Sequence, residues 1–126
     1  MEVSPPSGGR RSTRELRATI FREAAAIVER EFAAHITVEE VAPRVASSPR
    51  QLRRAFAEAA GMSFRSYLGT VRTNRAAELL ASTDLAVKDI ARRVGYLEAS
   101  ALTRAFRRNH GVSPSAFRRM SRSDSG

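Results

Sequence analysis

The sequence predicts an all-α protein of about seven helices, in which two helix-turn-helix subdomains are joined by a long linker helix. Three observations lead to this prediction. One pattern of apolar residues occurs twice in the chain. Residues that cap helices precede most of the apolar segments, and apolar residues recur at spacings of three and four. No segment shows the strict alternation that is typical of a strand.

The first helix is expected to begin at Ser12. Ser12 and Glu15 have the spacing of a capping box, in which each side chain accepts a hydrogen bond from an amide left free at the start of a helix. An apolar stripe follows, formed by Leu16, Ile20, Ala24, Ile27, Val28 and Phe32. Residues 1–11 are rich in proline, glycine and arginine, and are expected to form a disordered arm.

Two short helices are expected next. Thr37 and Glu40 form a second capping box, for a helix that runs to about Val45. Ser48 and Gln51 form a third, and a proline occupies the first position of the helix that follows. Only a tight turn separates the two helices, which is the arrangement of a helix-turn-helix motif.

A long amphipathic helix is predicted from Ser63 to Ser82, with short helices over about 87–94 and 99–109 and a final one from Ser113. The expected organisation is a disordered arm (1–11), a first helix-turn-helix subdomain (12–62), the linker helix (63–82), a second helix-turn-helix subdomain (83–120) and a disordered tail (121–126).

Comparison of the chain with itself supports the two units. Four apolar residues recur at a constant offset of 49 residues, namely Val38, Val41, Ala42 and Val45 with Val87, Ile90, Ala91 and Val94. Beyond the turn the offset becomes 50, matching Leu-Arg-Arg-Ala-Phe at 52–56 with Leu-Thr-Arg-Ala-Phe at 102–106, Gly61 with Gly111, Ser63 with Ser113 and Tyr67 with Phe117. One unit therefore occurs twice in the chain, and the turn of the second copy is one residue longer than that of the first.

The second helix of each unit carries the candidate functional residues. One face of this helix packs on the first helix, and the opposite face can enter the major groove of DNA. An arginine on that face can donate two hydrogen bonds to a guanine edge. The candidate DNA-binding residues are Arg50, Arg53 and Arg54 in the first unit and Ser100, Thr103, Arg104, Arg107 and Arg108 in the second. Arg108 is expected to contact a phosphate.

The charge of the chain favours nucleic acid over an anionic membrane as its partner. The formal net charge is +9, and 22 residues are basic. Acidic residues gather in 15–40, whereas 46–75 and 99–122 are strongly basic. The chain has no cysteine, which leaves no disulfide framework and no thiolate metal site. Because it has neither a signal-peptide pattern nor a membrane-spanning apolar run, a cytoplasmic location is expected, which for a DNA-binding protein means the nucleoid.

On these residues the chain resembles the AraC/XylS family of transcription regulators over residues 15–119. The specific pieces are Ser-Pro-Arg-Gln-Leu-Arg-Arg-Ala-Phe at 48–56, Ile-Ala-Arg-Arg-Val-Gly-Tyr at 90–96 and Leu-Thr-Arg-Ala-Phe-Arg-Arg at 102–108. The resemblance implies that helices 49–58 and 99–109 read bases through Arg50, Arg53, Arg54, Ser100, Thr103 and Arg104. It further implies an activator like the stand-alone single-domain members, without a small-molecule effector or cofactor. A fragment of a longer regulator is the alternative.

The linker length suggests how one chain could contact DNA. A helix from Ser63 to Ser82 spans about 28 Å, and one turn of DNA is about 34 Å. The two recognition helices could therefore occupy successive major-groove segments, so that the protein binds double-stranded DNA as a monomer.

The two units depart from the ideal pattern in different ways. Pro43 falls inside the first helix of the first unit, at an expected cost of about 3 kcal/mol in an ideal helix interior. The turn of that unit has Ala46 where the second has Gly95, although a left-handed turn residue favours glycine by about 1 kcal/mol. In the second unit Ala86 and Glu98 replace the caps Thr37 and Ser48. Because two candidate residues of the second unit, a serine and a threonine, are also short, the first unit is expected to supply most base contacts.

Two other interpretations come from different functional classes. One is a non-specific nucleoid-associated DNA-binding protein, held by phosphate contacts alone. The other is a protein-interaction module that docks on RNA polymerase or another regulator through the acidic first helix. An enzyme is not expected, because His35 and His110 follow helix ends, where histidine commonly interacts with the helix dipole, and because no phosphate loop or metal-ligand spacing occurs.

Overall fold

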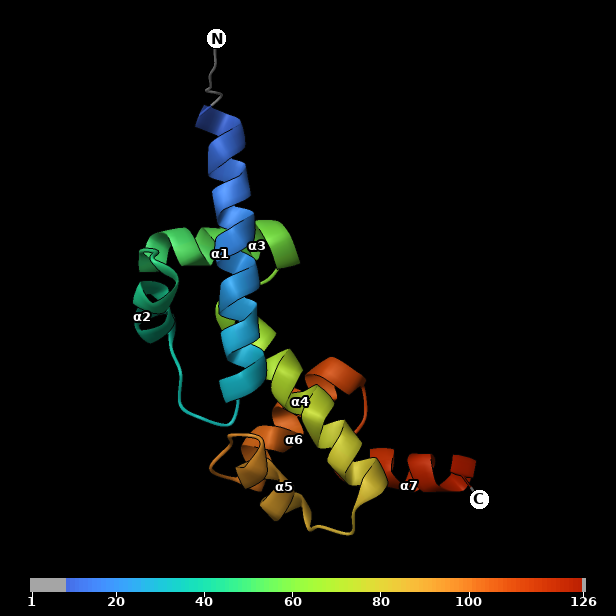
Figure 1. Ribbon diagram of the computed structural model, residues 1–126. Helices are drawn as coiled ribbons and strands as arrows, with labels where there is room; N and C mark the ends of the chain where they lie inside the picture. The colour runs from blue at the N-terminus through green and yellow to red at the C-terminus, as the bar shows by residue number, and fades with distance from the viewer. Residues whose placement is uncertain (1–8, 126) are drawn as a thin grey trace. The chain divides into compact units, whose positions relative to one another are not determined.

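The computed structural model describes residues 9–125, and the side chains of residues 13–123. All regular secondary structure in this part of the chain is helical (Figure 1), which confirms the predicted fold class. Its elements are α1 (Gly9–Glu31), α2 (Val38–Val41), the 3₁₀-helix η1 (Ala42–Val45), α3 (Pro49–Ala60), α4 (Phe64–Ser82), α5 (Val87–Arg93), α6 (Ala99–His110) and α7 (Pro114–Ser125). The expected arm at 1–11 lies largely outside the described residues, although residues 9–11 belong to α1.

Contacts divide the chain into two units. The first contains the residues up to Arg30 together with Ile36–Tyr67, and the second contains Glu31–His35 together with the residues from Leu68 onward. Helix α4, which corresponds to the predicted linker helix, begins in the first unit and continues in the second.

Phe56 of α3 is the centre of the core of the first unit. Its side chain is fully buried, and its ring lies edge-on to those of Phe21, Phe64 and Tyr67, with centroid distances of 5.0, 5.3 and 5.3 Å. Four residues of the predicted apolar stripe on α1 are buried in this unit, namely Ile20, Ala24, Ile27 and Val28. Leu16, predicted in the same stripe, is half exposed.

The core of the second unit is built around the equivalent phenylalanine. Phe106 is fully buried, lies edge-on to Phe117 at 5.4 Å and stacks on the imidazole of His110 at 4.4 Å. Helices α4, α5 and α6, with the C-cap residue of α5, supply the other residues of this cluster, which are Ala76, Leu80, Ile90, Ala91, Val94 and Leu102. The repeat seen in the sequence is therefore also a repeat in the packing.

Local capping sets most of the helix starts, as predicted. Thr37 and Glu40 form both hydrogen bonds of a capping box. Ser48 accepts a hydrogen bond from the amide of Gln51 at 3.1 Å. The side-chain oxygen of Gln51 does not return to Ser48 but accepts from the hydroxyl of Ser47 at 3.5 Å, so this cap is one-sided. Helices α4 and α7 start similarly, each with the preceding serine accepting from the amide three residues later.

Two helix ends differ from the sequence prediction. Helix α1 begins at Gly9, so that Ser12 lies inside the helix and is not its N-cap. Helix α7 continues to Ser125, where a disordered tail was expected. Arg122 supplies a physical reason, because its guanidinium donates to the carbonyl of Thr83 at 2.7 Å and so ties the last turns of α7 to the second unit.

The prediction of a continuous first helix through Pro43 was wrong. Helix α2 ends at Val41, and the chain continues as the 3₁₀-helix η1, with Pro43 in its first turn. A proline at the start of a helix lacks only an amide that has no helical partner. The penalty expected for a proline in a helix interior therefore does not apply.

The turn that follows η1 in the first unit and the turn that follows α5 in the second each contain a left-handed residue, as predicted. Ala46 has a φ of 53°, and among the described residues it is the only non-glycine with a positive φ. Its counterpart Gly95 has a φ of 106°. The first unit therefore carries backbone strain that the second unit avoids by using glycine.

Candidate nucleic-acid interface

Helix α3 presents an arginine face opposite its buried face. Leu52, Ala55 and Phe56 of this helix are buried in the core of the first unit. The three candidate residues of this helix all lie exposed on the other side, as expected for a recognition helix: Arg50, Arg53 and Arg54. The sequence therefore predicted correctly which side of α3 faces outward.

One of these arginines is engaged in an ion pair that the sequence did not predict. The Nη2 atom of Arg53 lies 2.7 Å from Oε2 of Glu39 on α2. Hydrogen bonds from the backbone amide of Glu39 itself and from Arg53 lower the pKa of the Glu39 carboxyl below its ordinary value. The repeat contains a signal for this pair, because the second unit replaces both partners: Lys88 takes the place of Glu39, and Thr103 takes the place of Arg53.

Helix α6 has the same two-sided organisation in the second unit. Leu102, Ala105 and Phe106 are buried. Four of the five candidate residues are exposed and Thr103 is partly buried; the exposed ones are Ser100, Arg104, Arg107 and Arg108. The hydroxyl of Ser100 donates to Oε1 of Glu98 at 3.3 Å. Glu98, which stands where the first unit has the N-cap Ser48, therefore binds one of the candidate DNA-binding side chains.

Three other arginines of the basic segments stabilise helix ends. Arg72 donates to the carbonyls of Phe32 and Ala34, which follow α1, at 2.8 and 3.0 Å. Arg118 donates to the carbonyls of Leu80 and Thr83 at the end of α4, both at 3.0 Å, and Arg122 also donates to Thr83. Carbonyls at the end of a helix have no partner within it, and a cation there also interacts favourably with the helix dipole. Part of the positive charge therefore has a structural role.

A family comparison identifies this arrangement. A family model described as a helix-turn-helix domain, of the AraC type, matches residues 41–120. The chain belongs to this AraC-type helix-turn-helix family. The resemblance predicted from the sequence motifs is confirmed, and the match includes both of the arginine-bearing helices of the AraC-type domain, α3 and α6.

Solved structures of AraC-type domains have the same fold. The C-terminal domain of AraT, a response regulator from Geobacillus stearothermophilus, is 38% identical, with a TM-score of 0.76 over 80% of this chain and 84% of that chain. The DNA-binding domain of AdpA, solved in complex with a target DNA, is 32% identical, with a TM-score of 0.77 over 82% of this chain and 94% of that chain. By family, the chain is therefore a DNA-binding domain of the type found in transcriptional regulators.

Curated relatives carry this domain as part of a longer protein. The uncharacterized HTH-type transcriptional regulator YtdP of Bacillus subtilis is 35% identical over 97 residues, which cover 77% of this chain and 13% of that protein. The chain spans about a third or less of the length of eight curated relatives that it matches. These relatives are described as regulators of transcription and not as enzymes.

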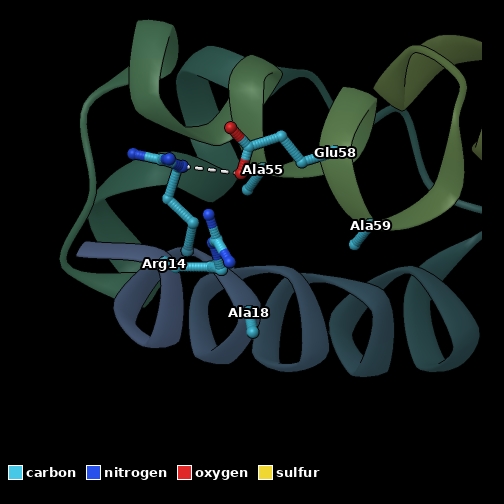
Figure 2. Close-up of a pocket in the computed structure, with 6 residues that line it drawn as sticks. Arg14, Ala18, Ala55, Glu58 and Ala59 are labelled. Carbon is cyan, nitrogen blue, oxygen red and sulfur yellow. Dashed lines mark hydrogen bonds and ion pairs between the residues drawn. The ribbon is translucent and has the colours of Figure 1, made fainter. Parts of the chain in front are cut away.

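A pocket lies between α1 and α3 in the first unit of the AraC-type domain (Figure 2). Its volume is about 450 Å³, and it is lined by Arg14, Arg17, Ala18, Ala55, Glu58 and Ala59. Arg17 pairs with Glu58 at 2.7 Å, and this hydrogen bond lowers the pKa of the Glu58 carboxyl. The lining otherwise consists of alanines and a second arginine, so it offers no pairing of a nucleophile with a base.

The described residues also contain no cluster of three or more histidine, cysteine, aspartate or glutamate side chains that could hold a metal ion. In the same part of the chain no helix is long and apolar enough to span a lipid bilayer.

Proposed function

We propose that the chain is a sequence-specific regulator of transcription that inserts α3 and α6 into successive segments of the DNA major groove. The observation that carries this proposal is the arginine face of α3, where Arg50, Arg53 and Arg54 lie opposite a fully buried apolar face. Bidentate contacts from such arginines distinguish guanine from the other bases. The face of α6 is more mixed, so we expect α3 to supply most of the base contacts.

The length of α4 supports the use of both helices on one duplex. Its 19 residues span about 28 Å, which is comparable with the roughly 34 Å of one turn of DNA. Because both recognition helices belong to one chain, we propose that it binds its site as a monomer. Sedimentation of the complex with a short duplex should give one chain per site.

Selection of bound sites from random duplex DNA tests the proposal. We expect two conserved boxes with centres about one helical turn apart, and a box contacted by α3 that contains guanines. A failure to enrich any motif, together with equal affinity for all sequences, would favour a non-specific nucleoid-associated protein instead.

We further propose that exposed glutamates of α1 contact RNA polymerase, so that the protein acts as an activator. Glu23 and Glu29 are both exposed on this helix, and their carboxylates would be repelled by the phosphates of DNA. Glu23→Lys should preserve DNA affinity and reduce transcription from a bound promoter in a purified system. Transcription equal to that with the wild type would refute this contact.

A further inference from the structure

We infer that Glu39 is a specificity-determining residue of the first unit, because it holds the guanidinium of Arg53 in position to donate to a guanine edge. The inference rests on the proposed function, since it requires α3 to enter the major groove.

The ion pair is placed where it can affect DNA contact. Glu39 lies in the first turn of α2, and its Oε2 atom is 2.7 Å from Nη2 of Arg53 on α3. The side chains of Arg53 and Glu39 are 57% and 63% exposed. Exposed ion pairs contribute little to folding stability. Stabilisation by the ion pair itself is therefore a weak explanation for this carboxylate, which in the first turn of α2 also interacts favourably with the helix dipole.

The contact leaves Arg53 able to recognise a base. A guanidinium has five N–H donors in a plane, and two of them belong to Nη2. Whichever of these two hydrogens points to Glu39, one complete edge of the guanidinium still offers two parallel donors. Two parallel donors are what the O6 and N7 atoms of guanine accept. Glu39 can therefore restrict a flexible side chain without occupying the edge that would meet the base.

The repeat indicates that Glu39 acts together with Arg53. In the second unit Lys88 takes the place of Glu39, and Thr103 takes the place of Arg53. A carboxylate occurs at this position only in the unit that has an arginine to pair with it. Since the second unit folds in the same way with a lysine here, the fold itself does not require the carboxylate.

The pair should penalise incorrect sites more than correct ones. On a site with guanine opposite Arg53, the guanidinium gains two acceptors and keeps its carboxylate. On a site without that guanine, Arg53 must give up Glu39 to reach a phosphate, and the carboxylate is then left facing the negative backbone. Such repulsion against the wrong partner is a recognised source of specificity.

Site selection with the whole chain tests this role. The Arg53→Ala variant first identifies the base pair that Arg53 contacts, as the position where the preference for guanine is lost. Glu39→Gln should then weaken the preference at that base pair by about tenfold, and leave the preferences at other positions unchanged. The matched control is Glu78→Gln, which removes the same charge from an exposed pair with Arg75 at 3.0 Å on α4. It should change no base preference.

Two further variants separate positioning from charge. Glu39→Asp keeps a carboxylate in the first turn of α2, and with it the interaction with the helix dipole, but its side chain is shorter. It should also lose preference at that base pair, and a wild-type preference would overturn the positioning role. In an Arg53→Ala background, Glu39→Gln should have no further effect on base preference. Circular dichroism and thermal unfolding establish that each variant is folded.

The remaining outcomes distinguish this inference from the proposed function. If Glu39→Gln changes the affinity for all sequences by one factor, Glu39 acts only through its charge and the inference is overturned. A wild-type chain that enriches a motif, together with an unchanged Glu39→Gln profile, overturns the inference alone. A wild-type chain that enriches no motif overturns both.

Discussion

Arg72 on α4 occupies the space that a side chain at position 95 would need. A Cβ atom built on Gly95 would lie 2.7 Å from Nε of Arg72. The guanidinium is held in place because it donates to the carbonyls of Phe32 and Ala34 and lies over the ring of Tyr96, 5.2 Å from its centroid. The turn of the second unit is therefore packed against an arginine that has no freedom to move away without losing its partners.

Gly95→Ala should destabilise the protein by about 2–4 kcal/mol. Roughly 1 kcal/mol comes from placing alanine at a positive φ, and the rest from displacing charged hydrogen bonds of Arg72, each worth about 1.5–3 kcal/mol. Urea unfolding followed by circular dichroism measures the change. Gly111→Ala is the matched control, because Gly111 also has a positive φ but an added Cβ meets nothing within 4 Å. Equal destabilisation by the two substitutions would contradict the role of Arg72.

Pro43→Arg should lower the free energy of unfolding by about 0.4–1 kcal/mol, because a proline that fits its native φ reduces the conformational entropy of the unfolded chain. Arginine is the residue at the equivalent position of the second unit, and it would raise stability only if an α-helix continued through this position. The structure has a 3₁₀-helix there, with Pro43 exposed in its first turn. Thermal unfolding checks the prediction, and an increase in Tm of several degrees would mean that α2 is continuous in solution.

What the sequence could predict depends on how far apart the interacting residues are. Thr37 and Glu40 contact each other within one helical turn, so their spacing alone predicts the cap. The buried faces of α3 and α6 follow from the helical period for the same reason. The outward-facing residues of these helices, including Arg50 and Arg104, were therefore predicted correctly as exposed.

The capping arginines could not be predicted in this way. Arg72 and Arg118 contact carbonyls that lie 35 to 40 residues away in sequence, and backbone carbonyls have no residue-type signature. In the sequence both arginines belong to the strongly basic segments that predict DNA binding. The pairing of Glu39 with Arg53 does not show in the charge of whole segments, because this contact depends on one residue in each of two helices.

Arg118→Met should lower the free energy of unfolding by about 2–3 kcal/mol. Methionine retains much of the apolar volume but donates nothing to the carbonyls of Leu80 and Thr83, and hydrogen bonds to charged groups contribute about 1.5–3 kcal/mol. The neighbouring Arg119 is exposed, and Arg119→Met provides the control, with an expected change below about 0.5 kcal/mol. Chemical unfolding of the two variants compares them directly, and similar values would argue against a capping role for Arg118.

Arg54→Ala should weaken binding to the selected site by about 1–3 kcal/mol and relax the base preference at one position. The reason is that Arg54 lies exposed on α3 opposite the buried Phe56, where a recognition helix would contact bases. Binding titrations on the selected site and on random DNA at one salt concentration measure the effect. If the affinity for random DNA falls by the same factor, Arg54 contacts the backbone and does not distinguish bases.

Arg108→Ala should weaken binding to the selected site and to random DNA by the same factor. Arg108 is exposed near the end of α6, two turns after Ser100 at the start of that helix, and a contact there is expected to be with a phosphate. Each phosphate contact releases condensed counterions, so its loss should reduce the slope of log K against log salt concentration by about one. Titrations over a series of salt concentrations measure the slope. A changed base preference with an unchanged slope would instead place Arg108 on a base edge, and would make the second unit a stronger contributor to specificity than its short Ser100 and Thr103 side chains suggest.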